Sequence, residues 1–361
     1  MTRFPGRAVS VKVIGVGGAG NNAVSRMARE KRADLEFLCV NTDIQALASM
    51  PGLPTFAIGP DLTRGLGSGG NPDLGRRAIR ESQDQLSPLI AGADLVFITA
   101  GMGGGTGTGA APVVAEIARK QGALTVAVVT RPFSFEGPRR GEIADKGVRR
   151  LLPKVDTMIT VENDSLLTAL DGGTSLDNAF TIADQVLTQG VNGISDIVTL
   201  PGLINVDFAD VRSVLNYGGP SFMAVGEGKG RRAGQYALSA ALTSPLFPAP
   251  IKGAQGVLLN IRGGKELSLG EVNDMAGALR SACGPEAHVV LGVVQDQDRK
   301  WKKRVSVTIV ATGLSRHDPS ETRDSATTFG EQLKRLEPAV GSSMGSNNGH
   351  GGPAHAMHKM F

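Results

Sequence analysis

The sequence predicts an α/β protein with a doubly wound first half, a long connecting helix and a smaller α+β domain. Three observations predict this fold class. From residue 11 onward, short β-branched runs alternate with longer stretches of helical spacing, as in a parallel sheet flanked by helices. Near residue 175 a longer helical pattern interrupts that alternation, and fewer helices follow it. The 361 residues also exceed the size at which one core usually stops growing, so we expect two domains.

The first half contains six predicted strands and four predicted helices in alternation. The strands are expected at residues 11–16, 36–41, 55–58, 94–100, 124–130 and 156–161, and the helices at residues 21–31, 74–91, 110–121 and 141–152. This alternation indicates a Rossmann-like, doubly wound domain.

The second half is expected to be α+β. A helical pattern runs from residue 175 to about residue 193, and the helix is expected to end near Pro201. Its apolar residues at helical spacing are Leu176, Phe180, Ala183, Val186 and Leu187. Strands are expected at residues 222–225, 256–261, 288–294 and 305–311, and helices at residues 232–242 and 268–282.

The composition changes beyond residue 315, where Gly, Ser, Asn and His replace apolar residues. Such a segment buries too little surface to offset its ordering entropy. The expected organisation is therefore a flexible N-terminus at 1–10, a doubly wound domain at 11–174, a connecting helix at 175–200, an α+β domain at 201–316 and a flexible tail at 317–361, with a short helix near residues 329–336.

Composition excludes several classes of protein. No segment approaches the roughly 20 apolar residues that span a bilayer, and no secretory signal is evident, so we expect a cytoplasmic protein without direct membrane insertion. Cys39 and Cys283 are predicted to be reduced core thiols. Four of the five histidines fall in the tail, which leaves little for a histidine base or a His/Cys metal site, and no protein-held metal is expected.

The net charge of +4 and the pI near 9.1 are modest for this length, and aromatic residues make up only 4%. We therefore expect no DNA binding. The densest basic run, residues 299–304 around Trp301, is interpreted first as a solvated hairpin and second as a patch for nucleic acid or anionic lipid.

A first glycine loop follows the first predicted strand and opens a helix. Gly15, Gly17 and Gly20 satisfy GxGxxG, a pattern in which backbone N–H groups and a helix N-terminus approach a phosphate. Taken alone it allows a dinucleotide-dependent dehydrogenase. That interpretation is weakened because the second strand ends in Asn41, with Asp43 two residues later, rather than in an acidic residue.

A second glycine loop decides between these interpretations. Residues 100–109 follow the fourth predicted strand and open another helix, so two loops at neighbouring strand ends can clasp a polyphosphate. Thr106 and Thr108 would add hydroxyl donors. The sequence contains no GxxxxGK[ST], so the cation must come from Mg²⁺ bound with the nucleotide rather than from a Walker lysine.

These residues resemble the tubulin/FtsZ family. The loop at residues 103–109 is similar to the family's signature, and residues 11–24 look like the FtsZ N-terminus. Further similar segments occur in the same order at residues 41–43, 62–72, 130–137, 189–196, 201–211, 253–260 and 307–313, so that the resemblance covers roughly residues 10 to 314. It implies a GTP-binding, GTP-hydrolysing protein that uses GTP/GDP with Mg²⁺ and polymerises into the cell-division ring at mid-cell.

The resemblance also implies which residues bind the nucleotide. Those around the first loop are Gly17, Gly18, Ala19, Asn21 and Asn22, and those at the phosphates are Gly101, Gly103, Gly104, Gly105, Thr106, Gly107 and Thr108. Glu136 and Arg140 would reach the ribose, and Asn163, Phe180 and Asp184 the base. Phe180 and Asp184 are also i, i+4, which places a ring and a carboxylate on one helix face. There they can stack on guanine and accept from its N1–H and amine, although Phe180 as an ordinary core residue stays open.

The predicted catalytic element is the polar turn with Asn205, Asp207 and Asp210. Two carboxylates three residues apart can orient an attacking water or hold a cation. The resemblance implies that this turn enters the nucleotide pocket of the next subunit, so the chain's own copies are its partners in a head-to-tail polymer. Asp207 can also serve as a helix N-cap. Division-machinery or membrane-anchor proteins are further expected partners, without identification.

The sequence departs from the family pattern at several places. Glu162 and Ser165 flank Asn163-Asp164 where proline and arginine are usual, and Pro138 stiffens the loop after Glu136. Residues 355–361 lack the usual Asp-Ile-Pro-aromatic adaptor peptide. Two alternatives therefore stay open, a tubulin-like scaffold with little GTP turnover and an NAD(P)-dependent oxidoreductase.

Overall fold

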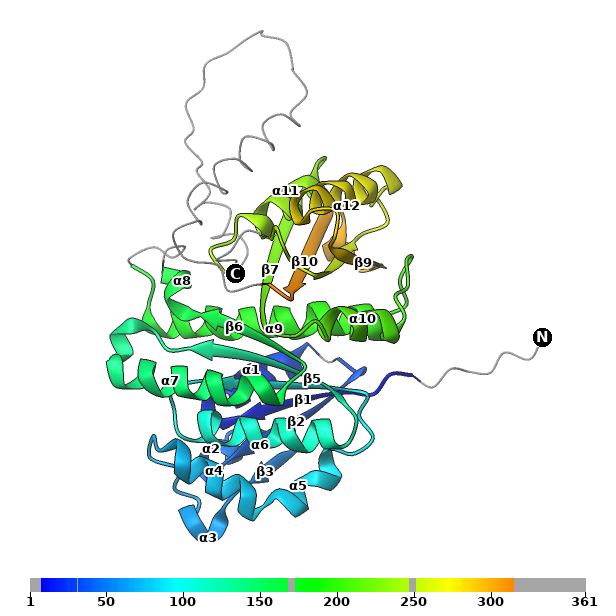
Figure 1. The fold of residues 1–361 in the computed structure, drawn as a ribbon. Coiled ribbons are helices and arrows are strands. Elements are labelled where there is room, and N and C mark those ends of the chain that lie inside the picture. The colour runs from blue at the N-terminus through cyan, green and yellow to red at the C-terminus, as the bar shows by residue number, and fades with distance from the viewer. Residues whose placement is uncertain (1–7, 31, 168–172, 247–250, 315–361) are drawn as a thin grey trace, which may run out of the picture.

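A single mixed sheet runs through the molecule (Figure 1). The structure is a computed structural model, and it describes residues 8–30, 32–167, 173–246 and 251–314. Ten strands of these residues follow the order β3-β2-β1-β4-β5-β6-β7-β10-β8-β9. The first and second halves of the chain meet at a short parallel ladder, in which Met158 pairs with Pro220 and Ile159 with Ser221.

The first half has the predicted doubly wound arrangement. Its parallel strands are β1 (Val11–Val16), β2 (Leu35–Asn41), β3 (Thr55–Ala57), β4 (Leu95–Gly101), β5 (Leu124–Arg131) and β6 (Thr157–Glu162). All six agree with the sequence prediction within one residue, and the central strands are short β-branched runs that the sheet buries on both faces, whereas β3 at the edge is largely exposed.

Helices cover both faces of this half: α1 (Gly17–Arg29), α2 (Ile44–Ala48), α3 (Pro60–Thr63), α4 (Pro72–Glu81), α5 (Gln83–Ile90), α6 (Thr106–Lys120), α7 (Pro138–Leu151) and α8 (Asn163–Leu167). Four of them correct the prediction. Helices α1 and α6 begin four residues earlier than expected, inside the glycine loops. The single helix expected at residues 74–91 is divided at Ser82, whose hydroxyl accepts from the N–H of Gly59.

The connecting helix α9 (Leu176–Thr199) agrees within one residue with the predicted connecting helix at 175–200, and it continues six residues beyond the clear helical pattern that ended near residue 193. It begins at Ser175, whose hydroxyl accepts from the N–H of Asn178 at 3.3 Å. Gly193 does not end it, because a side chain there would collide with Thr308 and because Asn260 donates to the Gly193 carbonyl at 3.0 Å. With 24 residues, α9 is about 36 Å long.

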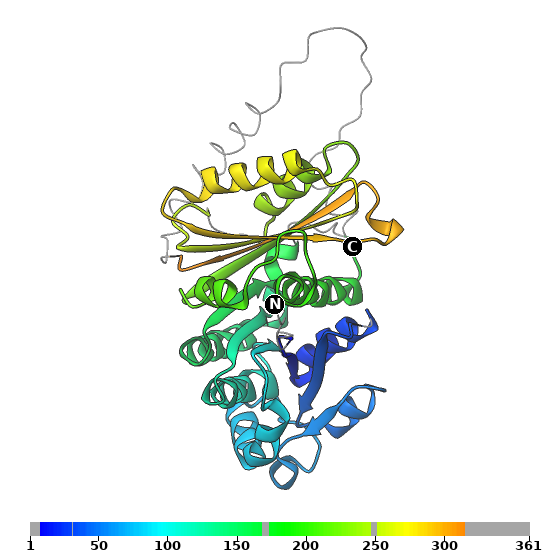
Figure 2. The same cartoon turned by 90° about the vertical axis from the view of Figure 1, so that its right-hand side faces the viewer.

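The second half contains α10 (Phe208–Leu215), β7 (Pro220–Lys229), α11 (Ala233–Leu242), β8 (Gly256–Gly263), α12 (Leu269–Cys283), β9 (His288–Gln295) and β10 (Arg304–Thr312). Figure 2 shows its helices α11 and α12 on one face of the sheet and α9 on the other. Strand β7 is six residues longer than predicted. Its Gly226 and Gly228 lie against the backbone of α11, where added Cβ atoms would come within 2.0 Å of carbonyl oxygens, so these glycines serve packing rather than a turn.

Both cysteines are buried and unpaired, as predicted. No helix among the described residues is long and apolar enough to cross a membrane. The helix expected near residues 329–336 and the expected flexible tail lie outside the described residues, as do residues 1–7.

Candidate functional site

The two glycine loops touch one another at the carboxyl edge of the sheet. Strands β1 and β4 are neighbours, with Val16 paired to Ala100, and the loops leave from these adjacent ends. A Cβ on Gly107 would lie 3.2 Å from the Val16 carbonyl oxygen, and one on Gly17 would lie 2.8 Å from the Gly107 nitrogen. Gly17 also has φ of +75°. Because no side chain fits between the loops, their backbones form one continuous surface.

Two helix N-termini open onto this surface. The residues before α1 and α6, Val16 and Gly105, make no side-chain cap hydrogen bond. The first N–H groups of both helices therefore lack side-chain caps, and both helix dipoles favour an anion at the same edge. Gly18, Ala19 and Asn22 lie exposed on the first loop.

The threonines of the second loop already have partners. The Thr106 hydroxyl lies 2.7 Å from that of Thr42 and 2.9 Å from that of Ser68, and Thr108 accepts from the N–H of Gly103 at 2.9 Å. Both side chains are buried. Because a hydroxyl has one donor and two acceptor positions, both threonines can keep these partners and still donate an O–H to a phosphate oxygen, as predicted. In the structure they hold the loop against the segment that precedes α4.

Two buried asparagines lack partners among the described residues. Asn21 is fully buried in α1, and neither its amide nitrogen nor its oxygen has a hydrogen bond. The side-chain oxygen of buried Asn163, at the start of α8, is also unpaired. Because unpaired buried polar groups are costly and rare, these two side chains indicate a ligand that satisfies them. Both belong to the predicted nucleotide set.

An aromatic group lies beside these residues at the N-terminal end of α9. The Phe180 ring is 39% exposed and makes an edge contact with Phe133, with 5.4 Å between centroids. Phe133 in turn stacks on Phe135. The exposure of Phe180 speaks against its being an ordinary core residue, and an exposed ring on a mostly buried helix is suited to stack on a base.

Asp184 follows Phe180 by one turn and is buried. Its carboxylate pairs with Arg26 of α1, with 3.1 Å from Oδ2 to Nε. Burial raises the pKa of Asp184 to about 6, against the hydrogen bond and charge of Arg26, which lower it. Sequence reasoning missed Arg26, because its partner lies 158 residues away and no motif marks it.

The two residues predicted to contact the ribose, Glu136 and Arg140, bind each other. Arg140 donates to Glu136, which also accepts from the N–H of Phe133 at 2.9 Å. The family departures have local explanations: Glu162 accepts from Arg131 at 3.0 Å, and Pro138 is the first residue of α7, where proline suits a helix.

The predicted catalytic residues lie elsewhere. Asn205 and Asp207 are exposed in the turn before α10 and Asp210 is exposed in its first turn, and the structure does not bring them to the glycine loops. Figure 1 shows α8 and α10 at opposite ends of α9. Asp207 occupies the N-cap position of α10, but its side chain makes no cap hydrogen bond. Asn205 accepts from the N–H of Gly202 at 2.7 Å.

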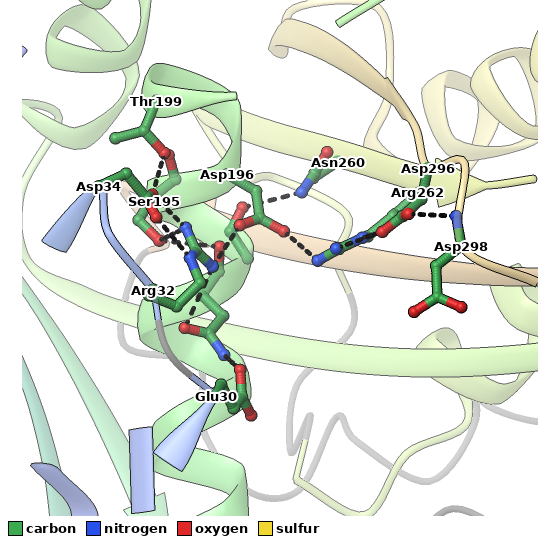
Figure 3. A network of polar contacts seen from close by, with 12 residues as sticks. Glu30, Arg32, Asp34, Ser195, Asp196, Thr199, Asn260, Arg262, Asp296 and Asp298 are labelled. Atoms are coloured by element: carbon green, nitrogen blue, oxygen red, sulfur yellow. Dashed lines mark hydrogen bonds and ion pairs between the residues drawn. The ribbon is translucent and has the colours of Figure 1, made fainter. Parts of the chain in front are cut away.

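A buried ion cluster connects this end of α9 to both halves of the chain (Figure 3). Asp196 of α9 lies 2.6 Å from Arg32, which follows α1, and 2.9 Å from Arg262 of β8. Arg32 also pairs with Asp34, and Arg262 with Asp296. The cluster fixes the position of α9 between the two halves, and the sequence analysis missed it because its charges are far apart along the chain.

No three His, Cys, Asp or Glu side chains of the described residues gather as a metal site. The protein groups at the loops are mainly backbone N–H groups and hydroxyls, which bind phosphate oxygens rather than cations. They fit a Mg²⁺ ion held largely by the phosphates of a nucleotide. The dehydrogenase alternative is not supported, because Asp43 caps α2 by accepting from the N–H of Ala46.

Both the sequence and the fold are similar to those of known proteins. A model of the tubulin/FtsZ family, GTPase domain, matches residues 10–171, and one of the FtsZ family, C-terminal domain, matches residues 219–315. The structure is similar to an empty FtsZ dimer from M. jannaschii, with 41% identity and a TM-score of 0.81 over 86% of this chain and 90% of that one. It is also similar in fold to a GTPγS-bound protofilament of CetZ2 from Haloferax volcanii, at 22% identity and a TM-score of 0.73 over 91% and 98% of the two chains.

Proposed function

The chain belongs to the tubulin/FtsZ family, and from this premise we propose that it hydrolyses GTP at a site shared between successive subunits of a head-to-tail filament. The glycine loops of one copy bind the phosphates, and the turn with Asp207 and Asp210 of the next copy completes the site. The filament would form the cell-division ring in the cytoplasm at mid-cell, as the family resemblance implies.

One observation carries this proposal. The free carboxylates of Asp207 and Asp210 lie beyond the far end of α9, a helix about 36 Å long, from the loops that would bind the nucleotide. Two carboxylates of the predicted nucleotide set are engaged, Glu136 by Arg140 and Asp184 by Arg26. A second copy placed end to end brings free carboxylates to the phosphates.

Each group has a defined task in this scheme. Backbone N–H groups at the starts of α1 and α6 hold the phosphates, and Phe180 and Asp184 hold the guanine. Asp207 and Asp210 of the next subunit orient the attacking water. Mg²⁺ bound with the nucleotide would supply positive charge to the phosphate oxygens.

Exposed apolar side chains at both ends support a contact between copies. Leu66 is 80% exposed near the glycine loops, and Leu203 is 62% exposed beside the predicted catalytic turn. Two different surfaces that meet head to tail produce an open filament rather than a closed dimer. The M. jannaschii relative is described as a dimer, which is consistent with self-association.

Mixing two inactive variants tests the shared site. Asp184→Ala should lose GTP binding but keep the catalytic carboxylates of its turn. Asp210→Asn should bind GTP but lack one of those carboxylates. Each alone should be inactive, and a mixture should recover phosphate release, because an Asp184→Ala subunit can complete the site of an Asp210→Asn subunit.

Two outcomes would contradict the proposal. A mixture as inactive as its components would reject the shared site. In a separate measurement on the unmodified protein, a specific activity that does not depend on protein concentration would reject it as well. If the unmodified protein pellets with GTP but releases almost no phosphate, the scaffold alternative is favoured.

A further inference from the structure

Positive charge is concentrated in the second half of the protein. Residues 220–314 contain twelve Lys and Arg against seven Asp and Glu, whereas residues 8–219 contain nineteen against twenty-two. Such an asymmetry between halves indicates a surface for a negatively charged partner.

Most of these cations lie at one edge of the sheet. Strands β7, β8 and β9 run in the same direction, since β10 is antiparallel to β7 and β8 and β9 is parallel to β8. Their carboxyl ends therefore lie together with the start of β10. Seven exposed cations at this edge form no ion pair with another described residue, and we name them the basic edge: Lys229, Arg231, Arg232, Lys265, Arg299, Lys302 and Lys303.

The basic edge is built on a fixed framework. Gly230 donates its N–H to the Lys303 carbonyl at 2.8 Å, and Arg304 pairs with Glu227 at 2.7 Å. The Arg262 guanidinium lies 4.9 Å from the centre of the Trp301 ring. These contacts hold unpaired cations close together, where mutual repulsion lowers stability. Fold stability therefore does not explain the cluster.

A cavity of about 370 Å³ opens within this edge. Arg231 and Lys303 line it, together with Arg304 and the carboxylates of Glu266 and Glu271. This volume admits a phosphate-bearing head group, which the two unpaired cations would contact.

Exposed apolar side chains accompany the cations. Leu269 is 83% exposed at the start of α12, between the cavity-lining Leu267 and Glu271, and Tyr236 is 58% exposed one turn after Arg232. Cations beside exposed Leu and Tyr match the interface of an anionic bilayer. A nucleic-acid backbone offers Leu269 no apolar partner, and Trp301 is covered by Arg262.

We propose that the basic edge binds the surface of bilayers that contain anionic phospholipid. Its place beside α9 leaves both filament ends free, because α9 crosses the strands in turn: Gly190 lies against Met223 of β7, Gly193 against Thr308 of β10, and Ile197 against Gly292 of β9. The strand ends therefore lie to the side of α9 and not at its termini. The proposal does not depend on polymerisation or on GTP turnover.

Vesicle flotation tests the proposal with the full chain in GDP. One variant carries Arg231→Gln, Lys302→Gln and Lys303→Asn; asparagine suits position 303, where φ is +52°. The control carries Lys120→Gln, Lys146→Gln and Arg149→Gln, three exposed cations on α6 and α7 with the same change of charge.

The unmodified protein and the control should bind vesicles with about one quarter phosphatidylglycerol and not pure phosphatidylcholine, more weakly as salt rises. The basic-edge variant should bind about 100-fold more weakly, roughly fivefold for each cation. Leu269→Gln, on the surface, should weaken binding several-fold at any salt concentration. Thermal unfolding confirms that each variant is folded.

The proposal is wrong if the basic-edge variant binds like the control, if Leu269→Gln has no effect on vesicle binding, or if pure phosphatidylcholine vesicles bind equally well. Tighter binding to a short DNA duplex than to the anionic vesicles, lost in the basic-edge variant, would assign the surface to nucleic acid instead.

Discussion

The two ends of α9 differ in how complete they are. At its N-terminal end the glycine loops, the buried Asn21 and the exposed Phe180 ring form a preshaped phosphate and base surface. At its C-terminal end Asp207 and Asp210 stand exposed and bind nothing through their side chains. At the first end the acids Glu136 and Asp184 of the predicted nucleotide set are each paired with an arginine, whereas the acids at the second end make no ion pair with a described residue. If the proposed function is right, each copy contains both halves of a site that it cannot assemble by itself.

Helix α9 holds these two ends at a fixed distance from each other. Helix α9 is continuous over 24 residues, and Asp196 near its end is held by Arg32 and Arg262. The catalytic turn is therefore presented at a fixed position relative to the glycine loops. A contact that fits one pair of copies fits the next pair as well.

The largest expected effect comes from separating the two glycine loops. Gly107→Ala places a Cβ 2.6 Å from the Gly101 carbonyl oxygen within the second loop and 3.2 Å from the Val16 carbonyl oxygen at the start of the first, so the backbones of both loops must shift. We expect GTP affinity to fall by about 1,000-fold, equal to about 4 kcal/mol, in a titration with fluorescent nucleotide. The control Gly277→Ala, where a Cβ meets nothing within 4 Å, should bind normally. Normal affinity in Gly107→Ala would show that the loops do not form the phosphate site.

The second prediction concerns the opposite end. Asp210→Asn removes an exposed carboxylate that makes no ion pair with a described residue, so the fold and GTP binding should be unchanged. Phosphate release should fall by about 100-fold or more, as expected when a group that orients water is lost. Asp274→Asn, an exposed acid on α12, is the matched control. A loss of GTP affinity in Asp210→Asn would instead place the residue in the nucleotide site of its own chain.

Much of the phosphate and base surface could be predicted from the sequence, because local physics determines it. A β-branched run followed by glycines specifies a strand, a tight turn and a helix start, and this pattern identified both loops. The strands of the first half agree within one residue for the same reason. Where glycine serves packing between elements, as at Gly226 and Gly228 of β7, the same residue type made the predicted strand too short.

What the sequence could not provide is pairing between distant charges. Arg26 meets Asp184, and Arg32 and Arg262 meet Asp196, only after the chain has folded. No spacing rule connects residues that are so far apart along the chain. The roles of residues 205–210 came from family resemblance, since two exposed acids three residues apart also occur at ordinary helix starts.

The third prediction concerns the pKa of Asp184, which lies at the N-terminal end of α9. Because burial raises this pKa from 3.8 to about 6, folding favours the protonated acid. Protonated Asp184 therefore contributes up to about 3 kcal/mol to the free energy of unfolding. This contribution is fully present below about pH 4 and is lost as pH rises through 6. Guanine needs the ionised form, so GTP affinity should fall about tenfold from pH 7 to pH 5 while the nucleotide-free protein becomes more stable.

Asp184→Asn is the control for both trends, measured by nucleotide titration and by thermal unfolding. It should bind GTP weakly, and both its affinity and its stability should depend less on pH than those of the unmodified protein. If the unmodified protein and Asp184→Asn respond identically between pH 5 and pH 7, Asp184 does not bind the base.

The smallest expected effect concerns the contact that joins the two ends. Leu203→Ser changes a side chain that is 62% exposed beside the catalytic turn, so stability should change by less than about 0.5 kcal/mol. If this leucine is buried between copies, losing it should cost about 1 kcal/mol, which raises the critical concentration for GTP-dependent pelleting about fivefold. Leu89→Ser, an exposed leucine on α5, should leave pelleting unchanged. GTP affinity should be the same in both variants, because neither side chain lies near the glycine loops. If Leu203→Ser and the unmodified protein have equal critical concentrations, the filament contact does not include this turn, and assembly does not depend on the residues that complete the site.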